Sequence, residues 1–251
     1  MNAMNALPEF YQSPIGRMAQ DFLLARLRKL LTRGGANGRT LIIGYGLPFA
    51  SDIAEVTGGQ VFLAYLDGMA AAPWPSVDAH HCCIATTDAL PFSDVTFDQV
   101  MLVHALELAP DPLQLMHEVQ RVLAAEGKVI CIVPNRRGLW SWFEHTPFGE
   151  GQTFSCSQMR RLLISVELSP LQVGAALFAP PLDFSCHELT RAIARAIEAI
   201  GNHLSIHIGG AVVATAQKQR YAGTGTKVRT PRARVRMQWA AAPAAARAKT
   251  I

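Results

Sequence analysis

Short continuous apolar runs recur along the chain and predict buried β-strands, because a strand covered on both faces needs no polar alternation. Seven such runs lie at 40–46, 60–66, 80–86, 96–106, 128–134, 171–180 and 209–219. Apolar residues spaced three and four apart predict helices at 18–31, 48–59, 111–127, 155–166 and 186–202. This order predicts an α/β fold with a mostly parallel sheet covered on both faces, in which the last two strands pair antiparallel.

Capping residues support the helix assignments. In the clearest helix, Asp111 is a good N-cap, Pro112 suits the first helical position, and Gly127 is expected to end the helix. The next helix is expected to begin at Ser155 or Ser157.

The composition describes an ordinary globular chain. Its 251 residues, 50% of them apolar, fit one large α/β domain or two small ones. No apolar run reaches the ~18 residues that a membrane span needs, and the N-terminus lacks the pattern of a signal peptide, so a cytoplasmic protein is expected. None of the five cysteines forms a C-x-x-C pair, which favours reduced thiols over a disulfide framework or a metal site.

Positive charge is concentrated at the C-terminal end. The segment 222–251 holds seven basic residues and no acidic one, whereas the whole chain has a net charge of +4. Such a composition predicts a disordered tail, which either is only solvated or attracts nucleic acid or an anionic membrane nonspecifically. The basic residues are Lys227, Arg229, Arg232, Arg234, Arg236, Arg247 and Lys249.

The first predicted strand runs into a glycine turn, "LIIGYGLPFA". A Walker loop needs a following lysine that is absent here, and a dinucleotide fingerprint needs a third glycine where Phe49 stands. Both phosphate-binding interpretations are therefore excluded. A nucleoside ligand without phosphate requires only that Gly44 and Gly46 let the backbone approach it, while Pro48 begins the next helix.

The predicted topology brings three strand ends together. In an open parallel sheet, ligands lie along the carboxyl ends of the strands, where the strand order reverses. Here those ends are Gly44–Gly46, Tyr65–Asp67 and His104.

The stretch "FSDVTFDQVMLVHALELAPDPLQLMHEVQRVLAAEGKVICIVPN" resembles the central part of the class I S-adenosylmethionine-dependent methyltransferases of the type 11 group. In that family an LPF-x-D-x-x-FD turn precedes strand four, and ALE, a DP helix start and RVL-x-x-G-G follow. The matching residues are Leu90-Pro91-Phe92, Asp94, Phe97-Asp98, Ala105-Leu106-Glu107, Asp111-Pro112 and Arg121-Val122-Leu123. Across about residues 10–221, including "VPNRRGLWSWFEHTPFG", the chain is similar to a bacterial branch of the family.

The resemblance implies a Rossmann-like class I methyltransferase fold, with a mostly parallel seven-stranded sheet and an antiparallel last strand. It also implies S-adenosylmethionine as cofactor. We expect an N-terminal helical segment or lid at 1–35, a methyltransferase-like domain at 36–221 and the basic tail at 222–251.

The cofactor motif departs from the family pattern. The third glycine of the first loop is replaced by Pro48, which has no N–H. The acidic residue expected at the ribose aligns with Tyr65, and Asp67 follows two residues later; the aspartate expected near the adenine aligns with Thr86, close to Asp88. Together the residues expected at the cofactor are Tyr11, Gly44, Tyr45, Gly46, Tyr65, Asp67, Thr86, Asp88 and His104.

Few side chains suggest acid–base chemistry, and methyl transfer from a sulfonium needs little of it. His104 ends the fourth strand and either serves as a base or hydrogen-bonds a loop carbonyl. Tyr11 belongs to the expected lid or packs against the sheet edge. After the fifth strand, Arg136 and Arg137 could receive an anionic substrate or lie in solvent.

Aromatic residues follow in the same loop. Trp140, Trp142 and Phe143 could form an acceptor pocket or a partner surface. Arg137 and Trp140 are the residues expected to contact the substrate.

Two functions from different classes follow from these observations. The first is a methyltransferase that transfers a methyl group to an unidentified acceptor, such as a small molecule. The second is a weakened methyltransferase-like chain that serves as a binding or regulatory subunit of a protein complex. An RNA modifier recruited through the basic tail is a third hypothesis that rests on charge alone.

Overall fold

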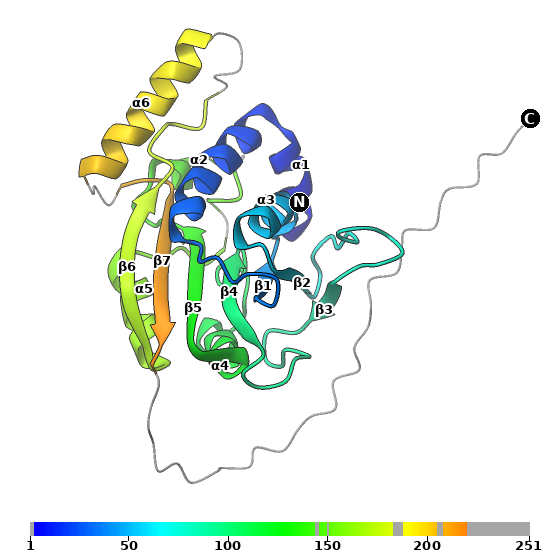
Figure 1. The fold of residues 1–251 in the computed structure, drawn as a ribbon. Coiled ribbons are helices and arrows are strands. Elements are labelled where there is room, and N and C mark those ends of the chain that lie inside the picture. Colours follow the sequence, from blue (N-terminus) through cyan, green and yellow to red (C-terminus); the bar gives the residue numbers. More distant parts are fainter. Residues whose placement is uncertain (1–2, 144–145, 150, 183–187, 205–207, 220–251) are drawn as a thin grey trace, which may run out of the picture.

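A computed structural model describes residues 3–143, 146–149, 151–182, 188–204 and 208–219 (Figure 1). The helices are α1 (Ala3–Gln12), α2 (Pro14–Leu30), α3 (Leu47–Thr57), α4 (Pro112–Val122), the short 3-10 helix η1 (Leu139–Trp142), α5 (Cys156–Ser165) and α6 (Glu188–Leu204). The strands are β1 (Arg39–Gly44), β2 (Gln60–Leu66), β3 (Cys82–Ala85), β4 (Phe97–Val103), β5 (Leu123–Pro134), β6 (Leu168–Ala176) and β7 (Ala211–Lys218).

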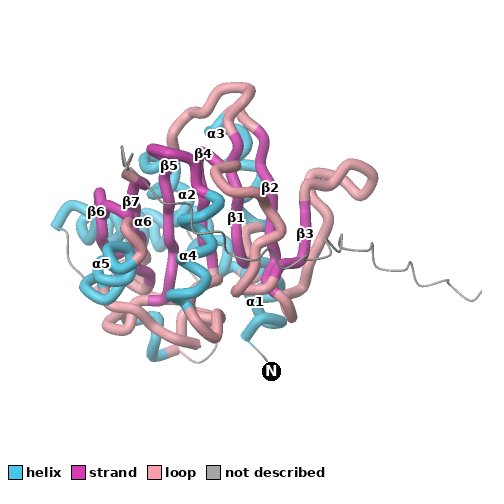
Figure 2. Tube along the Cα trace, turned by 90° about the horizontal axis from the view of Figure 1, so that it is seen from below, coloured by secondary structure: helices cyan, strands magenta, loops and turns pink. Residues whose placement is uncertain are grey.

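The strands form one sheet in the order β3-β2-β1-β4-β5-β7-β6. The first five in this order run parallel, and β7 runs antiparallel to both of its neighbours. Helices α2 and α3 cover one face of the sheet, and α4 and α5 cover the other (Figures 1 and 2). The mostly parallel seven-stranded sheet with an antiparallel end is thereby confirmed.

The boundary between α4 and β5 differs from the prediction. Asp111 does cap α4, because its carboxylate accepts the backbone N–H groups of Leu113 and Gln114. The helix, however, ends at Val122, and Gly127 lies inside β5. Leu123 already has extended backbone angles and pairs with Phe97, so burial of the Leu123 side chain in the sheet ends the helix earlier than the glycine would.

Helix α1 lies in the N-terminal segment 1–35, which was expected to be helical or a lid, but hydrophobic periodicity predicted a helix only at 18–31. It contains Pro8 and packs directly against α2, whose N-cap Ser13 accepts the N–H of Gly16 at 3.0 Å. A Cβ atom on Gly16 would lie 1.9 Å from the carbonyl oxygen of Phe10, so the glycine allows the two helices to meet closely. A glycine at this position therefore allows the sharp turn from α1 into α2.

The family-like "LPF" turn has a structural role in this chain. The Arg121 guanidinium donates to the carbonyl oxygens of Leu90 and Phe92 and pairs with Asp94 and Glu118. The Glu118 carboxylate also accepts the N–H of Leu90 at 2.8 Å. The motif thus binds the loop before β4 to the last turns of α4.

One sequence expectation, the basic tail at 222–251, lies outside the described residues. Within the described part, none of the helices combines the length and apolar character that crossing a bilayer requires. The capping prediction for α5 is confirmed at Ser155, which forms a reciprocal capping box with Gln158.

Candidate functional site

The first feature of the site is the point where β1 and β4 lie side by side. Chain connections leave this pair in opposite directions, so the strand order reverses here, and ligands of open α/β sheets bind at such a point. Gly44 pairs with Val103, and the N–H of Tyr45 donates to the Val103 carbonyl at 2.8 Å. The carboxyl ends of the two strands are therefore held together by backbone hydrogen bonds.

Both glycines of the turn are required by the fold itself. Gly44 has a φ of +93°, and a Cβ there would lie 2.2 Å from the Val103 carbonyl oxygen. At Gly46 a Cβ would lie 2.2 Å from Cγ2 of Ile42. The sequence interpretation assigned these glycines to the approach of a ligand, but close packing against Val103 of β4 and Ile42 of β1 explains them without one.

Pro48 begins a helix, as its position in the sequence predicts. It stands in the first turn of α3, where its missing N–H costs nothing, and its carbonyl accepts a hydrogen bond from Gln20 at 2.6 Å. This contact joins α3 to α2.

Three buried polar side chains are linked by hydrogen bonds at the end of β4. The Tyr11 hydroxyl lies 2.8 Å from His104 Nε2, and His104 Nδ1 lies 2.8 Å from Glu107 Oε1. In the tautomer that carries its proton on Nδ1, the imidazole donates to the Glu107 carboxylate and accepts the Tyr11 O–H at Nε2. The sequence left open whether His104 serves as a base or hydrogen-bonds a loop carbonyl. In the structure both ring nitrogens are bonded to side chains and not to a loop carbonyl.

Aromatic rings surround these three hydrogen-bonded side chains. Tyr11 stacks on Tyr45 with ring centroids 5.9 Å apart and meets Phe49 edge-on at 5.6 Å, while Phe148 meets the His104 ring at 5.2 Å. All five side chains are buried. Burial and the nearby Glu107 charge raise the pKa of Tyr11, so its phenol stays protonated and able to donate. With α1 in this position, the ring of His104 has no open path to solvent.

The polar residues expected at a nucleoside lie at the ends of β2 and β3. Tyr65 is fully buried, and its hydroxyl donates to the Ala72 carbonyl at 3.0 Å, so it is not available to a ribose. Asp67, Thr86 and Asp88 are exposed. Neither aspartate carboxylate has a hydrogen-bond or ion-pair partner among the described residues, which leaves both able to accept from a ligand's hydroxyl or amine.

Of the two residues expected to contact the substrate, Arg137 is exposed and Trp140 is buried. Arg137 is exposed just after β5. Trp140 lies in the core, where its indole N–H donates to the Ala179 carbonyl at 2.8 Å and its ring meets Phe148 edge-on at 5.3 Å. Trp140 is therefore separated from His104 by the Phe148 ring, which contacts both residues.

Sequence reasoning missed the pairing of Glu107 with His104. Their three-residue separation could have suggested it, but β4 ends at Val103 and His104 has a φ of 51°, which no spacing rule reveals. Across the described residues, no cluster of three or more histidine, cysteine or acidic side chains is arranged to hold a metal ion.

Comparison with known proteins agrees with this geometry. Residues 51–131 match the methyltransferase domain family. A demethylmenaquinone methyltransferase from Lysinibacillus sphaericus is 32% identical over 104 residues, which are 39% of this chain and 39% of the relative. The aligned region thus spans about two fifths of that relative's length.

Solved structures share the fold at low identity. A SAM-dependent methyltransferase from Thermotoga maritima has a TM-score of 0.58 and 18% identity, covering 84% of this chain and 94% of that one. The geranyl diphosphate C-methyltransferase from Streptomyces coelicolor A3(2), in complex with Mg²⁺, geranyl diphosphate and S-adenosyl-L-homocysteine, has a TM-score of 0.55 and 16% identity, covering 78% and 76%. These likenesses establish the architecture of the sheet and its helices.

Proposed function

Since this chain carries a class I methyltransferase domain, we propose that it transfers a methyl group from S-adenosylmethionine to a small-molecule acceptor. The observation that carries the proposal is the edge where β1, β2 and β4 end. It combines the strand-order reversal with a buried histidine that is hydrogen-bonded to a hydroxyl and with the exposed carboxylate of Asp67. The exposed carboxylate of Asp88 follows the adjacent strand β3, and neither carboxylate has a hydrogen-bond or ion-pair partner among the described residues.

The residues at this edge fit the nucleoside part of the cofactor. Asp67 would accept the ribose hydroxyls, and Asp88, with Thr86 beside it, would face the adenine amine. A hydrogen bond to a charged carboxylate contributes about 1.5–3 kcal/mol. When bound, S-adenosylmethionine supplies a methyl group activated by a sulfonium, and its transfer to a hydroxyl or amine releases the acceptor's proton.

His104 would receive that proton at Nε2. Glu107 holds the opposite ring nitrogen, which fixes the tautomer and stabilises the charged imidazole that forms. In this structure the Tyr11 hydroxyl bonds to Nε2, so Tyr11 occupies the place where an acceptor's O–H or N–H group would bind.

We accordingly propose that α1 acts as a lid. Tyr11, Tyr45 and Phe49 cover the end of β4 from the α1 side, and exposing His104 requires that α1 move aside. When α1 closes again, the Tyr11 phenol replaces the product on His104 and excludes water from the site.

A small-molecule acceptor is supported by the names of similar proteins. The Lysinibacillus sphaericus relative is a demethylmenaquinone methyltransferase, and the Streptomyces coelicolor enzyme methylates geranyl diphosphate at carbon. Geranyl diphosphate joins an apolar geranyl chain to an anionic diphosphate. The aromatic surroundings of His104 are suited to the apolar part of such a molecule.

The proposal is tested by measuring S-adenosylhomocysteine formation from S-adenosylmethionine with panels of phenols, quinols and amines. We expect turnover with at least one class, reduced about 10²–10⁴-fold in His104→Gln, because a positioned base contributes about that much. Asp78→Asn, an exposed acid in the loop after β2, is the matched control and should keep full activity.

Tyr11→Phe separates the lid from the chemistry. It removes the hydroxyl that competes for His104 Nε2 but keeps the ring contacts, so turnover should be maintained or rise. Absence of turnover in every panel, together with intact cofactor binding, would instead favour a binding or regulatory role for this chain.

A further inference from the structure

The Tyr11 ring fills a cage of aromatic side chains at the end of β4. It stacks on Tyr45 with the ring planes 26° apart, and it meets Phe49 and His104 edge-on, with ring centroids 5.6 and 5.8 Å apart. Phe10, its neighbour in α1, adds an edge-on contact at 5.1 Å. Flat rings prefer such stacked and edge-on partners, whereas an aliphatic chain gains nothing from their orientation. The cage is therefore shaped for a planar ring.

The polar end of the cage accepts one hydrogen bond. The Tyr11 hydroxyl lies 2.8 Å from His104 Nε2, and the Glu107 carboxylate lies 2.8 Å from the opposite nitrogen, Nδ1. With its proton on Nδ1, the imidazole presents a lone pair at Nε2 and pairs with a donor such as a hydroxyl. A ring that carries a carboxylate would offer no donor and would also face the negative charge of the buried Glu107. The cage thus selects a ring with a neutral hydrogen-bond donor.

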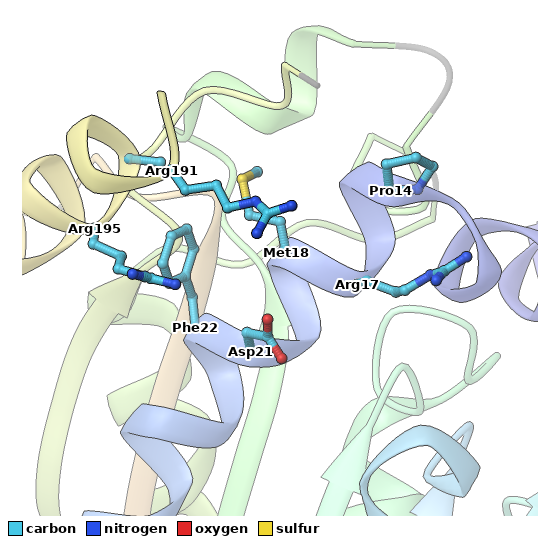
Figure 3. A pocket seen from close by; sticks show the side chains of 8 residues that line it. Pro14, Arg17, Met18, Asp21, Phe22, Arg191 and Arg195 are labelled. Atoms are coloured by element: carbon cyan, nitrogen blue, oxygen red, sulfur yellow. The ribbon is translucent and has the colours of Figure 1, made fainter. Parts of the chain in front are cut away.

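Tyr11 and Phe10 are the part of the cage that can move as one unit. Helix α1 ends at Gln12 and α2 begins at Pro14, so a single residue joins the two helices. Arg17, which also lines a cavity between α2 and α6, turns toward the end of α1 (Figure 3), where its guanidinium donates to the Gln12 carbonyl at 2.8 and 3.1 Å. These exposed bonds keep the end of α1 at the junction. Rotation of α1 about the junction would withdraw both rings and leave the other walls of the cage in place.

We propose that the methyl acceptor is a phenol, which binds in the cage that the Tyr11 phenol fills in this structure. Tyr11 is then a competitor of the substrate that the chain itself carries. The phenol-binding cage rests on the contacts around Tyr11, whereas its use in methyl transfer rests on the proposed function.

The reaction would convert the phenol into its aryl methyl ether. A new bond joins the phenol oxygen to the methyl carbon, and the bond between methyl and sulfur breaks with its electron pair left on sulfur, which gives S-adenosylhomocysteine. The hydroxyl proton passes to His104 Nε2, the atom that accepts the Tyr11 hydroxyl in this structure.

The first test uses unsubstituted phenol as the probe on the full chain, without any methyl donor. Phenol that enters the cage displaces Tyr11, so hydrogen exchange of the α1 amides should become faster at millimolar phenol. Fluorobenzene has nearly the same size but no donor and should leave this exchange unchanged. Tyr11→Phe keeps the competing ring without its hydrogen bond, so it should bind phenol about tenfold more tightly than wild type.

A second variant, Tyr11→Ala, opens the cage and removes the competitor. Calorimetry should show saturable binding of phenol that is at least about tenfold tighter than binding of fluorobenzene or of cyclohexanol, a donor that is not planar. The matched control Asp78→Asn should bind phenol within twofold of wild type. Equal binding of phenol and fluorobenzene, or unchanged α1 exchange with phenol in both wild type and Tyr11→Phe, would overturn the proposal.

Turnover assays and a calorimetric titration with S-adenosylhomocysteine distinguish this proposal from the proposed function. If S-adenosylhomocysteine forms with aliphatic amines or alcohols but with no phenol, the phenol assignment fails and the methyltransferase proposal stands. If phenol binds and releases α1 as expected but S-adenosylhomocysteine does not bind, the phenol site stands and its use in methyl transfer fails.

Discussion

His104 combines three features that are rarely found together in one residue. Its φ is 51°, a left-handed conformation that costs a non-glycine residue of order 1–3 kcal/mol. Both ring nitrogens are hydrogen-bonded to side chains, and the ring is buried. The partner carboxylate Glu107 keeps a second buried oxygen, Oε2, without a hydrogen-bond partner among the described residues. Strain and an unsatisfied carboxylate oxygen at one point support a functional role for this position.

Cys131, in the centre of β5, yields a prediction about stability at alkaline pH. Burial, with the Glu107 charge, raises the pKa of its thiol from 9.0 to about 12. The folded protein thus holds this proton more tightly than the unfolded chain, so the contribution is fully present below pH 9 and is lost as pH rises toward 12.

Between pH 8 and pH 10, we expect Cys131 to lower the free energy of unfolding by about 1.4 kcal/mol, the value of one pKa unit. Urea unfolding at both pH values should show a smaller loss for Cys131→Ala than for wild type, whatever the variant's stability at pH 8. Identical losses in the two proteins would contradict this account.

At the scale of elements, α6 is attached to the sheet through one carboxylate. Glu198 is buried and accepts the N–H groups of Leu177 and Phe178 at 3.0 and 2.6 Å. Gly201 packs on the Phe178 ring, where a Cβ would lie 2.2 Å from a ring carbon. The isoleucines on another side of α6 are exposed, Ile193 by 48% and Ile200 by 58%, so they take no part in its docking.

Glu198→Ala should therefore cost about 2–4 kcal/mol, because it leaves two backbone N–H groups in the core without their charged partner. The expected signs are a lower urea midpoint and faster proteolysis within α6. Glu55→Ala, an exposed glutamate on α3, should change neither. If the Glu198 variant were as stable as that control, the carboxylate would not be what holds α6.

Elements with strong local signals were predictable, and those set by distant contacts were not. Asp111-Pro112 marks the start of α4 correctly, whereas Gly127 misplaces its end because Leu123 joins the sheet first. The expected helical segment at 1–35 covers α1, but periodicity did not mark α1 as a separate helix, because it is positioned by tertiary contacts with α2 and, through Tyr11, with His104.

At the scale of the whole molecule, the alternation of strands and helices predicted the sheet, since each apolar run had one way to be buried. The candidate site was only partly predictable. Gly44, Asp67 and His104 follow from the rule that strand ends meet, but the contact between Tyr11 and His104 joins residues that lie 93 positions apart. No pattern within α1 or β4 indicates that contact.

The central claim, that the edge formed by β1, β2 and β4 holds a methyl donor, is tested most directly by calorimetric titration of the full chain with S-adenosylhomocysteine. We expect saturable heat with one site per chain, at least about tenfold weaker binding in Asp67→Asn because a charged hydrogen bond is lost, and binding within twofold of wild type in Asp78→Asn. Absence of saturable heat at millimolar ligand would contradict the claim.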